Sequence, residues 1–152
     1  MTKDIQPKLI ELFKEGNCTP QISVIAKKLK EPATTIHYNI KRLEEEKAIR
    51  AYKAVFDYKK INEGHCTYIF INLSQENYAD PEKIAKEIAR DSRVESVDVV
   101  TGDSELIVKL RTKDIDEYYE TMKAWIKKYN LGKTTSVTSL KQVKTEFVNI
   151  EE

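Results

Sequence analysis

The chain has 152 residues, enough for one domain or two small ones. With 40% hydrophobic and 34% charged residues, it is expected to be a soluble globular protein with more charge than the usual quarter. No apolar run approaches the roughly 20 residues needed to cross a membrane, and the first residues lack a signal-peptide core, so we expect a cytoplasmic protein with no membrane partner. Its two cysteines, Cys18 and Cys66, form no CxxC pair and are expected to be free thiols.

The net charge of +1 is unevenly distributed along the chain. Residues 1–53 contain 11 basic and 7 acidic residues, a net charge of +4. The remaining residues contain 15 basic and 18 acidic residues, a net charge of −3. A basic front part suits contacts with phosphates, whereas the mildly acidic rear part suits another task.

A helix is predicted over residues 4–15, and two further helices, separated by a short break, are predicted between Thr19 and Ile49. The first of this pair has apolar residues at helical spacing: Ile22, Ile25, Ala26 and Leu29. Thr19 is its expected N-cap, with Pro20 in the first turn. Pro32 disfavours helical dihedrals at the preceding residue, so this helix should end by Lys30. The pair is predicted to be a helix–turn–helix.

The second helix of the pair carries Ile36, Ile40 and Leu43 on one face, which we expect to be buried. Thr34 or Thr35 is its expected N-cap. The opposite face gathers hydrogen-bonding, aromatic and cationic side chains: Thr34, Thr35, His37, Tyr38, Lys41 and Arg42. A recognition helix that enters the major groove of DNA has this layout. The alternative is an ordinary helical hairpin with a solvated polar face.

The rear part alternates between strand and helix patterns. Strands are predicted over residues 66–74, 93–101, 105–111 and 134–148, with one helix starting at Asp80-Pro81 and another over residues 114–130. This βαββαβ order is the ferredoxin-like arrangement, in which two helices cover one side of an antiparallel sheet. Both faces of the first strand are largely apolar, so sheet-to-sheet dimerisation is expected to cover the other side. A further strand is predicted over residues 49–58.

Several segments of the front part resemble the DNA-binding half of the Lrp/AsnC (feast/famine) transcription regulators. They are Ile25-Ala26-Lys27-Lys28-Leu29, Thr34-Thr35-Ile36, the run from Ile40 to Glu46, and Ala48-Ile49. The chain departs from the family pattern at two positions, because Lys30 and Lys47 stand where family members commonly have glycine. The resemblance spans essentially the whole chain and implies a sequence-specific regulator that binds double-stranded DNA as a homodimer, tetramer or octamer. It also implies that the strand at 49–58 links the two domains and pairs with its counterpart in a second subunit.

The resemblance also implies the fold class, an α+β chain with a three-helix (winged) helix–turn–helix domain followed by a ferredoxin-like βαββαβ sandwich. We place the DNA-binding domain at residues 1–49, a strand and linker at 50–64, and an effector-binding and oligomerisation domain at 65–152. In the family, small effectors, typically amino acids, bind between dimers near a valine-threonine-glycine stretch that the run from Val97 to Glu105 resembles.

An amino-acid site needs an acceptor for the ammonium and donors for the carboxylate. The run Thr135 to Thr138 also resembles a threonine-rich stretch of the family that faces the same cleft. The resemblance therefore implies that Thr101, Gly102, Asp103, Glu105 and Thr138 supply these groups here. Ser104-Glu105 replaces the acidic pair that follows glycine in the family, with Glu105 keeping the carboxylate. The alternative is a polar hairpin that binds no ligand.

Two other function classes stay open. Certain haem-biosynthesis decarboxylases resemble these regulators, but the few rear-part candidates for their pocket, His65, Arg90, Arg93 and Arg111, argue against an enzyme. A DNA-packaging protein with little sequence preference is the other class. No GxxxxGK, GxSxG or HExxH motif occurs, so no catalytic residue is predicted. The histidines and cysteines lack metal-ligand spacing, so neither a metal nor another cofactor is expected.

Overall fold

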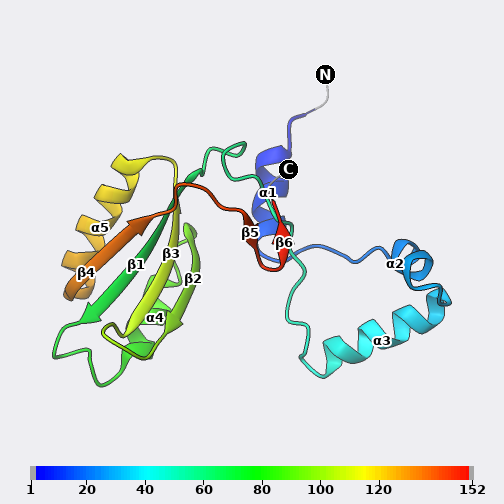
Figure 1. Ribbon diagram of the computed structural model, residues 1–152, viewed down its shortest axis with the longest axis horizontal. Helices are drawn as coiled ribbons and strands as arrows, with labels where there is room; N and C mark the ends of the chain where they lie inside the picture. The colour runs from blue at the N-terminus through cyan, green and yellow to red at the C-terminus, as the bar shows by residue number, and fades with distance from the viewer. Residues whose placement is uncertain (1–2, 151–152) are drawn as a thin grey trace. The chain divides into compact units, whose positions relative to one another are not determined.

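The computed structural model describes residues 3–150 and divides into two compact units, Met1–Val55 and Phe56–Glu152 (Figure 1). The division falls inside the segment 50–64 in which a linker is expected. Each unit is described by itself below.

The first unit contains three helices, α1 (Gln6–Lys14), α2 (Ile22–Leu29) and α3 (Ala33–Glu45). The Asp4 carboxylate accepts a hydrogen bond from the Gln6 amide at 3.0 Å, which satisfies one of the unpaired amides at the start of α1. The three predicted helices are therefore confirmed, with shifts at their ends.

The expected N-caps of α2 and α3 are wrong. Thr19 does not cap α2, because the backbone of Gln21 is still extended (φ −85°, ψ 94°) and the helix begins only at Ile22. Thr34 and Thr35 lie inside the first turn of α3, because Pro32 is extended (φ −60°, ψ 144°) and occupies the N-cap position. The Pro32 carbonyl accepts the first helical hydrogen bond, from Ile36, at 3.1 Å.

The apolar stripe of α3 is only partly buried. Ile36 is 6% exposed, whereas Leu43 is 43% exposed and Ile40 is intermediate. Leu29 of α2 is also largely exposed. Two short helices cover each other only where they meet, so the expectation that Ile36, Ile40 and Leu43 are all buried holds only for Ile36.

The strand predicted over residues 49–58 is not formed within the described chain. A strand needs a partner along its length, but this segment has only one isolated bridge, between Asn17 and Tyr52, and a hydrogen bond from Ala54 to the Phe13 carbonyl at 3.3 Å.

The close approach of the segment after α1 to Ala51 requires a glycine. Gly16 has φ +90°, and a Cβ there would lie 2.7 Å from that of Ala51.

The second unit contains the predicted βαββαβ series. Its elements are β1 (His65–Leu73), α4 (Pro81–Ile88), β2 (Val94–Val99), β3 (Leu106–Thr112), α5 (Ile115–Tyr129) and β4 (Leu131–Thr138). The four strands form an antiparallel sheet in the order β2-β3-β1-β4, so the ferredoxin-like fold is confirmed. Asp80 and Asp114 cap α4 and α5, each accepting a hydrogen bond from the amide three residues on.

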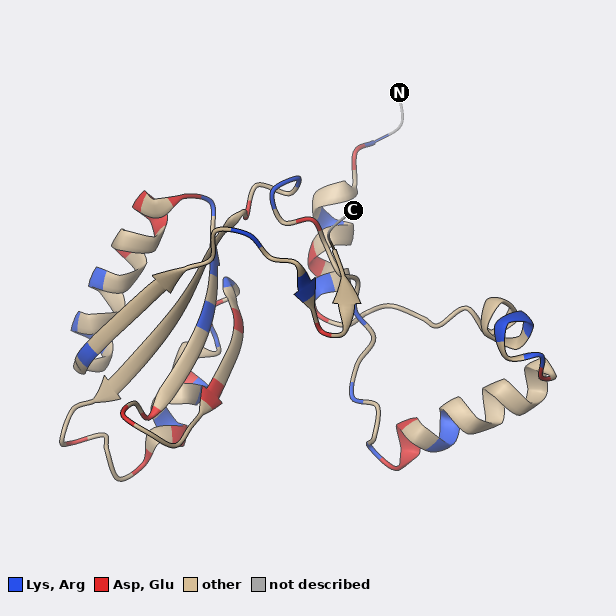
Figure 2. Ribbon diagram, in the orientation of Figure 1, with Lys and Arg blue, Asp and Glu red and all other residues tan. Residues whose placement is uncertain are grey.

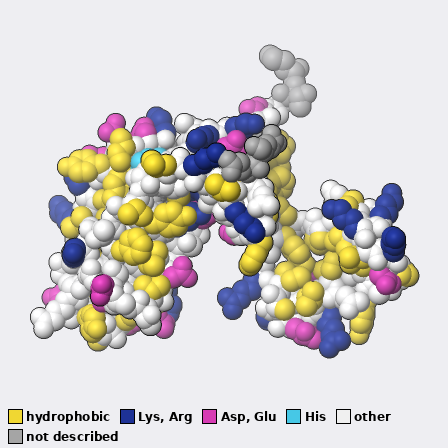
Figure 3. Space-filling model, viewed as in Figure 1, with side chains coloured by type: hydrophobic (Ala, Val, Ile, Leu, Met, Phe, Trp, Pro, Cys, Tyr) yellow, Lys and Arg dark blue, Asp and Glu magenta, His cyan; other side chains and the backbone are white. Residues whose placement is uncertain are grey.

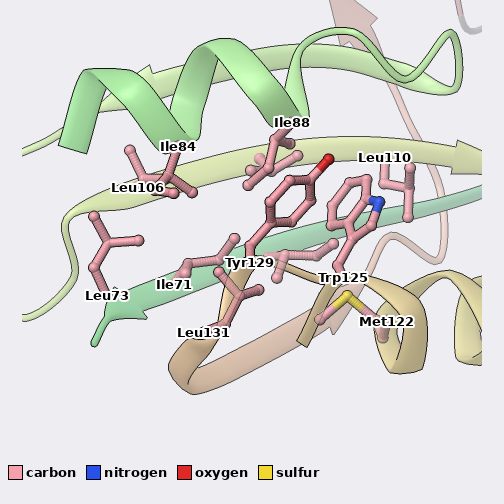
Figure 4. Packing of buried hydrophobic residues seen from close by; sticks show 12 residues of the cluster. Ile71, Leu73, Ile84, Ile88, Leu106, Leu110, Met122, Trp125, Tyr129 and Leu131 are labelled. Atoms are coloured by element: carbon pink, nitrogen blue, oxygen red, sulfur yellow. The ribbon is translucent and has the colours of Figure 1, made fainter. Parts of the chain in front are cut away.

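Alternate residues of the strands pack against α4 and α5 to form a single core layer. Figure 4 shows Trp125, Met122 and Tyr129 of α5 turned toward the strands and toward Ile88 of α4. Trp125 is 4% exposed, whereas its neighbour Ile126 is 43% exposed, so the tryptophan and not the isoleucine belongs to the core.

The opposite face of the sheet carries no helix. Tyr68, Phe70 and Ile107 on this face are half-buried, and Val137 is half-exposed. Figure 3 shows hydrophobic side chains gathered over the strands. We call these four residues the open-face patch.

The predicted fourth strand is confirmed as β4, but its predicted range, residues 134–148, is wrong because the strand ends at Thr138. Asn130 adopts a left-handed conformation (φ 48°, ψ 52°) that ends α5, and β4 begins at the next residue. The last hydrogen bond to β1 is from Ser139 to Cys66, next to the start of β1. The chain beyond has no neighbouring strand in the sheet and folds into its own short hairpin, β5 (Lys144–Thr145) and β6 (Val148–Asn149).

Candidate functional site

The polar face of α3 is exposed over its whole length. All six side chains predicted to contact DNA are solvent-exposed: Thr34, Thr35, His37, Tyr38, Lys41 and Arg42. Tyr38 lies near the middle of this face and is 66% exposed. The helix thus presents hydroxyl, imidazole, phenol and cationic groups together, the donors and acceptors that base edges and phosphates require.

The run Glu44-Glu45-Glu46 follows this face, and each of its three carboxylates interacts with another side chain of the first unit. Glu45 pairs with Lys41 at 3.8 Å, and Glu46 accepts a hydrogen bond from the Arg42 guanidinium at 2.8 Å. The Glu44 carboxylate accepts a hydrogen bond from the Tyr52 hydroxyl at 2.8 Å. Partial burial and the neighbouring carboxylate both raise the pKa of Tyr52. Exposed ion pairs at this spacing contribute about 0.3–0.5 kcal/mol each to stability. Breaking them to free Lys41 and Arg42 for contacts with phosphates therefore costs little free energy.

The turns on either side of α3 each contain a lysine with positive φ. Lys30 (φ 55°) ends α2, and its amide donates to the Ala26 carbonyl. Lys47 (φ 60°) follows α3, and its amide donates a hydrogen bond to the backbone carbonyl of Glu44. The backbone therefore takes the left-handed path that glycine favours, although both residues carry a side chain. Figure 2 shows the basic stretches at the end of α2 and in the second half of α3.

The loop between β2 and β3 is the candidate effector region. Thr101, Gly102 and Asp103 are exposed, and Gly102 has φ +113° with open space around it. The Asn72 side-chain amide donates to the Asp103 carbonyl, which ties the loop to β1. One oxygen of Glu105 accepts the Leu73 amide at 2.8 Å, so this carboxylate is partly committed to the sheet.

Thr138 lies elsewhere within the chain. It pairs with Thr67 in the ladder between β1 and β4, whereas the Glu105 amide donates to Ile71. Four residues along a strand separate these positions by roughly 13 Å. The structure therefore brings Thr101, Gly102, Asp103 and Glu105 together but does not bring Thr138 to them in the same chain.

A buried ionic cluster lies at the other end of the sheet. Glu95 of β2 pairs with Lys109 at 2.8 Å and with Arg111 at 2.6 Å, and all three side chains are at most 11% exposed. Burial by itself raises the pKa of Glu95, but the hydrogen bonds and charges of Lys109 and Arg111 outweigh it and leave the pKa lowered. Arg111 also stacks on the Tyr58 ring, 3.8 Å from its centroid. Arg111 is thus engaged in holding the sheet.

Arg93 is engaged in the same way. Its guanidinium binds the Asp91 carboxylate at 2.7 Å and the Thr121 hydroxyl at 2.7 Å, joining the start of β2 to α5. Burial alone raises the pKa of Asp91, but the hydrogen bonds from Arg93 lower it below its ordinary value. Two of the rear-part arginines considered for an enzyme pocket are therefore occupied by carboxylates of the chain itself.

Within residues 3–150, no helix is long and apolar enough to span a membrane. In the same range, no three histidine, cysteine, aspartate or glutamate side chains are grouped so that they can hold a metal ion.

Comparison with known proteins identifies the family. Residues 66–148 match the model of the Lrp/AsnC ligand binding domain, more than half of the chain. An uncharacterized HTH-type transcriptional regulator of Pyrococcus horikoshii is 32% identical over 144 residues, covering 94% of this chain and 95% of the relative. The chain belongs to the Lrp/AsnC family.

Solved Lrp/AsnC structures share the whole fold. An AsnC family transcriptional regulator from Agrobacterium tumefaciens has a TM-score of 0.73 at 20% identity, covering 99% of this chain and 96% of that one. The feast or famine regulatory protein of M. tuberculosis, complexed with L-methionine, has a TM-score of 0.74 at 17% identity, covering 94% of both chains. At these identities the likeness establishes the fold alone, with its helix–turn–helix and ferredoxin-like domains.

Three features of this Lrp/AsnC protein lie outside its predicted site residues, and the sequence signals them to different degrees. The partners of Lys41 and Arg42 follow them at i+4, a spacing from which Glu45 and Glu46 can be read. The conformation of Lys30 and Lys47 carries no signal in their own residue type; it shows only as a departure from the glycines of the family. The hydrogen bond from Asn72 depends on the sheet register and has no local sequence signal.

Proposed function

We propose that this protein is a sequence-specific DNA-binding transcription regulator that acts as a dimer or higher oligomer. The observation that carries the proposal is the exposed polar face of α3, placed directly after α2 in a helix–turn–helix. The net charge of +4 over residues 1–53 supports it, since two such units in a dimer double the positive field at the phosphates.

Each α3 enters a major groove, and the two helices of a dimer reach successive grooves about 34 Å apart on a pseudo-palindromic site. Thr34 and Thr35 hold the register on the phosphate backbone. His37 and Tyr38 contact base edges or thymine methyl groups. Lys41 and Arg42 leave their glutamate partners to contact phosphates or guanine.

The loop Thr101–Glu105 is proposed as part of an effector site for an amino acid. The support is the M. tuberculosis relative complexed with L-methionine, together with the exposed hydroxyl, amide and carboxylate groups of this loop. Because Thr138 is distant within the chain, it can join this loop only from a second subunit. Effector binding between subunits then changes the spacing of the α3 helices, which couples the two sites.

The test compares two tyrosines of equal exposure. Tyr38 is 66% exposed on α3, and Tyr78 is 64% exposed in the second unit. Tyr38→Ala is expected to reduce binding to a selected duplex by about 5- to 150-fold, since one base contact is worth about 1–3 kcal/mol. Tyr78→Ala is expected to bind like the wild type. Fluorescence anisotropy measures both, and equal affinity of the two variants and the wild type contradicts the role of α3.

A further inference from the structure

Two lysines flank α3, and neither has a visible structural task. Lys30 and Lys47 are exposed, and among residues 3–150 neither has an ion pair or a side-chain hydrogen bond. Their amides make the hydrogen bonds that end α2 and α3, and those bonds need no side chain. The lysine side chains therefore do not explain how the turns are held.

The backbone at both positions disfavours a side chain. Lys30 has φ 55° and ψ 42°, and Lys47 has φ 60°. In this region the Cβ atom crowds the following carbonyl oxygen, a cost that glycine avoids. Backbone strain at exposed positions that have no packing role is typical of residues with a function.

The charges of α3 itself are partly neutralised. Lys41 and Arg42 each have a glutamate partner one turn further on. Among residues 3–150, Lys30 and Lys47 have no such partner, so each end of α3 is flanked by a cation without a counter-charge. Unpaired exposed ammonium groups are strongly attracted to a polyanion because they give up no existing pair.

The spacing of the two lysines suits the phosphate backbones. α3 has 13 residues, which at 1.5 Å per residue makes it about 20 Å long. The major groove is about 12 Å wide, so a helix of this length within it brings both of its ends near the phosphates that line it. Lysine side chains are long enough to reach outward from both turns.

We propose that Lys30 and Lys47 clamp the phosphate backbones on the two sides of the groove that α3 enters, an inference that rests on the DNA-binding function proposed above. The contacts are independent of base sequence and set affinity and register, whereas the face of α3 sets specificity. The one competing explanation is that both lysines complement the negative ends of their helices.

The experiment measures binding of a fluorescein-labelled duplex of mixed sequence between about 50 and 200 mM salt. Lys30→Gly and Lys47→Gly are each expected to raise the thermal midpoint, because strain is relieved, and to weaken binding. Each lost contact is expected to reduce the slope of log K against log salt by about 0.9. A role in the helix ends alone predicts the opposite pattern, a lower midpoint with an unchanged slope.

Two controls accompany these variants. The double variant Lys30→Arg, Lys47→Arg keeps both charges and is expected to keep the wild-type slope. Lys133→Gln removes one exposed charge of β4 and is expected to change neither slope nor affinity. If the wild type binds but the glycine variants keep its slope, this inference fails and the proposed function stands. If the wild type binds no duplex at all, both fail.

Discussion

At the scale of single residues, the buried ionic cluster of the sheet depends on Glu95. Its carboxylate is the counter-charge for both Lys109 and Arg111, at 2.8 and 2.6 Å. Removing one partner of a buried ion pair leaves the others without compensation and costs about 3 kcal/mol. Glu95→Gln is therefore expected to lower the free energy of unfolding by about this amount, measured by urea denaturation with the single, buried Trp125 as fluorescent probe.

The same residue predicts a pH dependence. The pKa of Glu95 is lowered in the folded state, so its contribution to stability is full above the ordinary pKa of glutamate, about 4.3, and is lost as the pH falls through the lower, folded value. The wild type should lose more stability on acidification than Glu95→Gln does. Glu82→Gln, which removes an exposed pair with Lys86, is the control and should change stability by less than about 0.5 kcal/mol.

At the scale of elements, the start of β4 depends on a glycine. A Cβ on Gly132 would lie 2.7 Å from the Asn72 carbonyl oxygen of β1, and backbone atoms cannot yield as a flexible side chain can. Gly132→Ala is expected to reduce the free energy of unfolding by about 1–3 kcal/mol through this overlap. Lys133→Ala, at the exposed neighbouring position, is the control. Equal stability of the two variants in urea would show that β4 tolerates the methyl group.

The elements that sequence predicted well are those with long, periodic apolar patterns. The helices α4 and α5 and the strands β1 to β3 follow from their apolar periodicity, and the structure confirms the predicted start of α4 at the Asp80 cap. The predicted N-caps of α2 and α3 are wrong, because the extended backbones of Gln21 and Pro32, and not threonine side chains, precede the first helical residues. The strand predicted at 49–58 is absent from the single chain, where it has no partner strand, and its pairing with a second subunit stays a prediction.

The candidate sites were predictable to different degrees. The polar face of α3 follows from helical periodicity once Ile36 is placed inside, and each predicted contact residue is exposed. The loop Thr101–Glu105 is five residues of contiguous sequence, so its members stay together. Thr138 joined them only through resemblance, and its position depends on the register of β4 on β1, which the sequence does not encode locally.

At the scale of the whole molecule, the open-face patch favours self-association. Tyr68, Phe70, Ile107 and Val137 lie on a face without a helix, and exposed apolar surface of this kind usually marks an interface. Sedimentation at micromolar concentration is expected to give a dimer or a larger species. Phe70→Asp should shift the protein toward monomer, because a charge is costly in a buried interface, whereas Tyr119→Asp on the exposed side of α5 should not.

If α3 reads DNA sequence, selection of bound duplexes from a random pool will reveal the sequence that it prefers. The wild type is expected to enrich a pseudo-palindromic motif with half-sites one helical turn apart. Adding amino acids is expected to change the enriched spacing if the loop Thr101–Glu105 binds an effector. Tyr38→Ala should lose the motif while Tyr78→Ala retains it. A pool that stays random with the wild type, in the presence and absence of amino acids, contradicts sequence-specific DNA binding by α3.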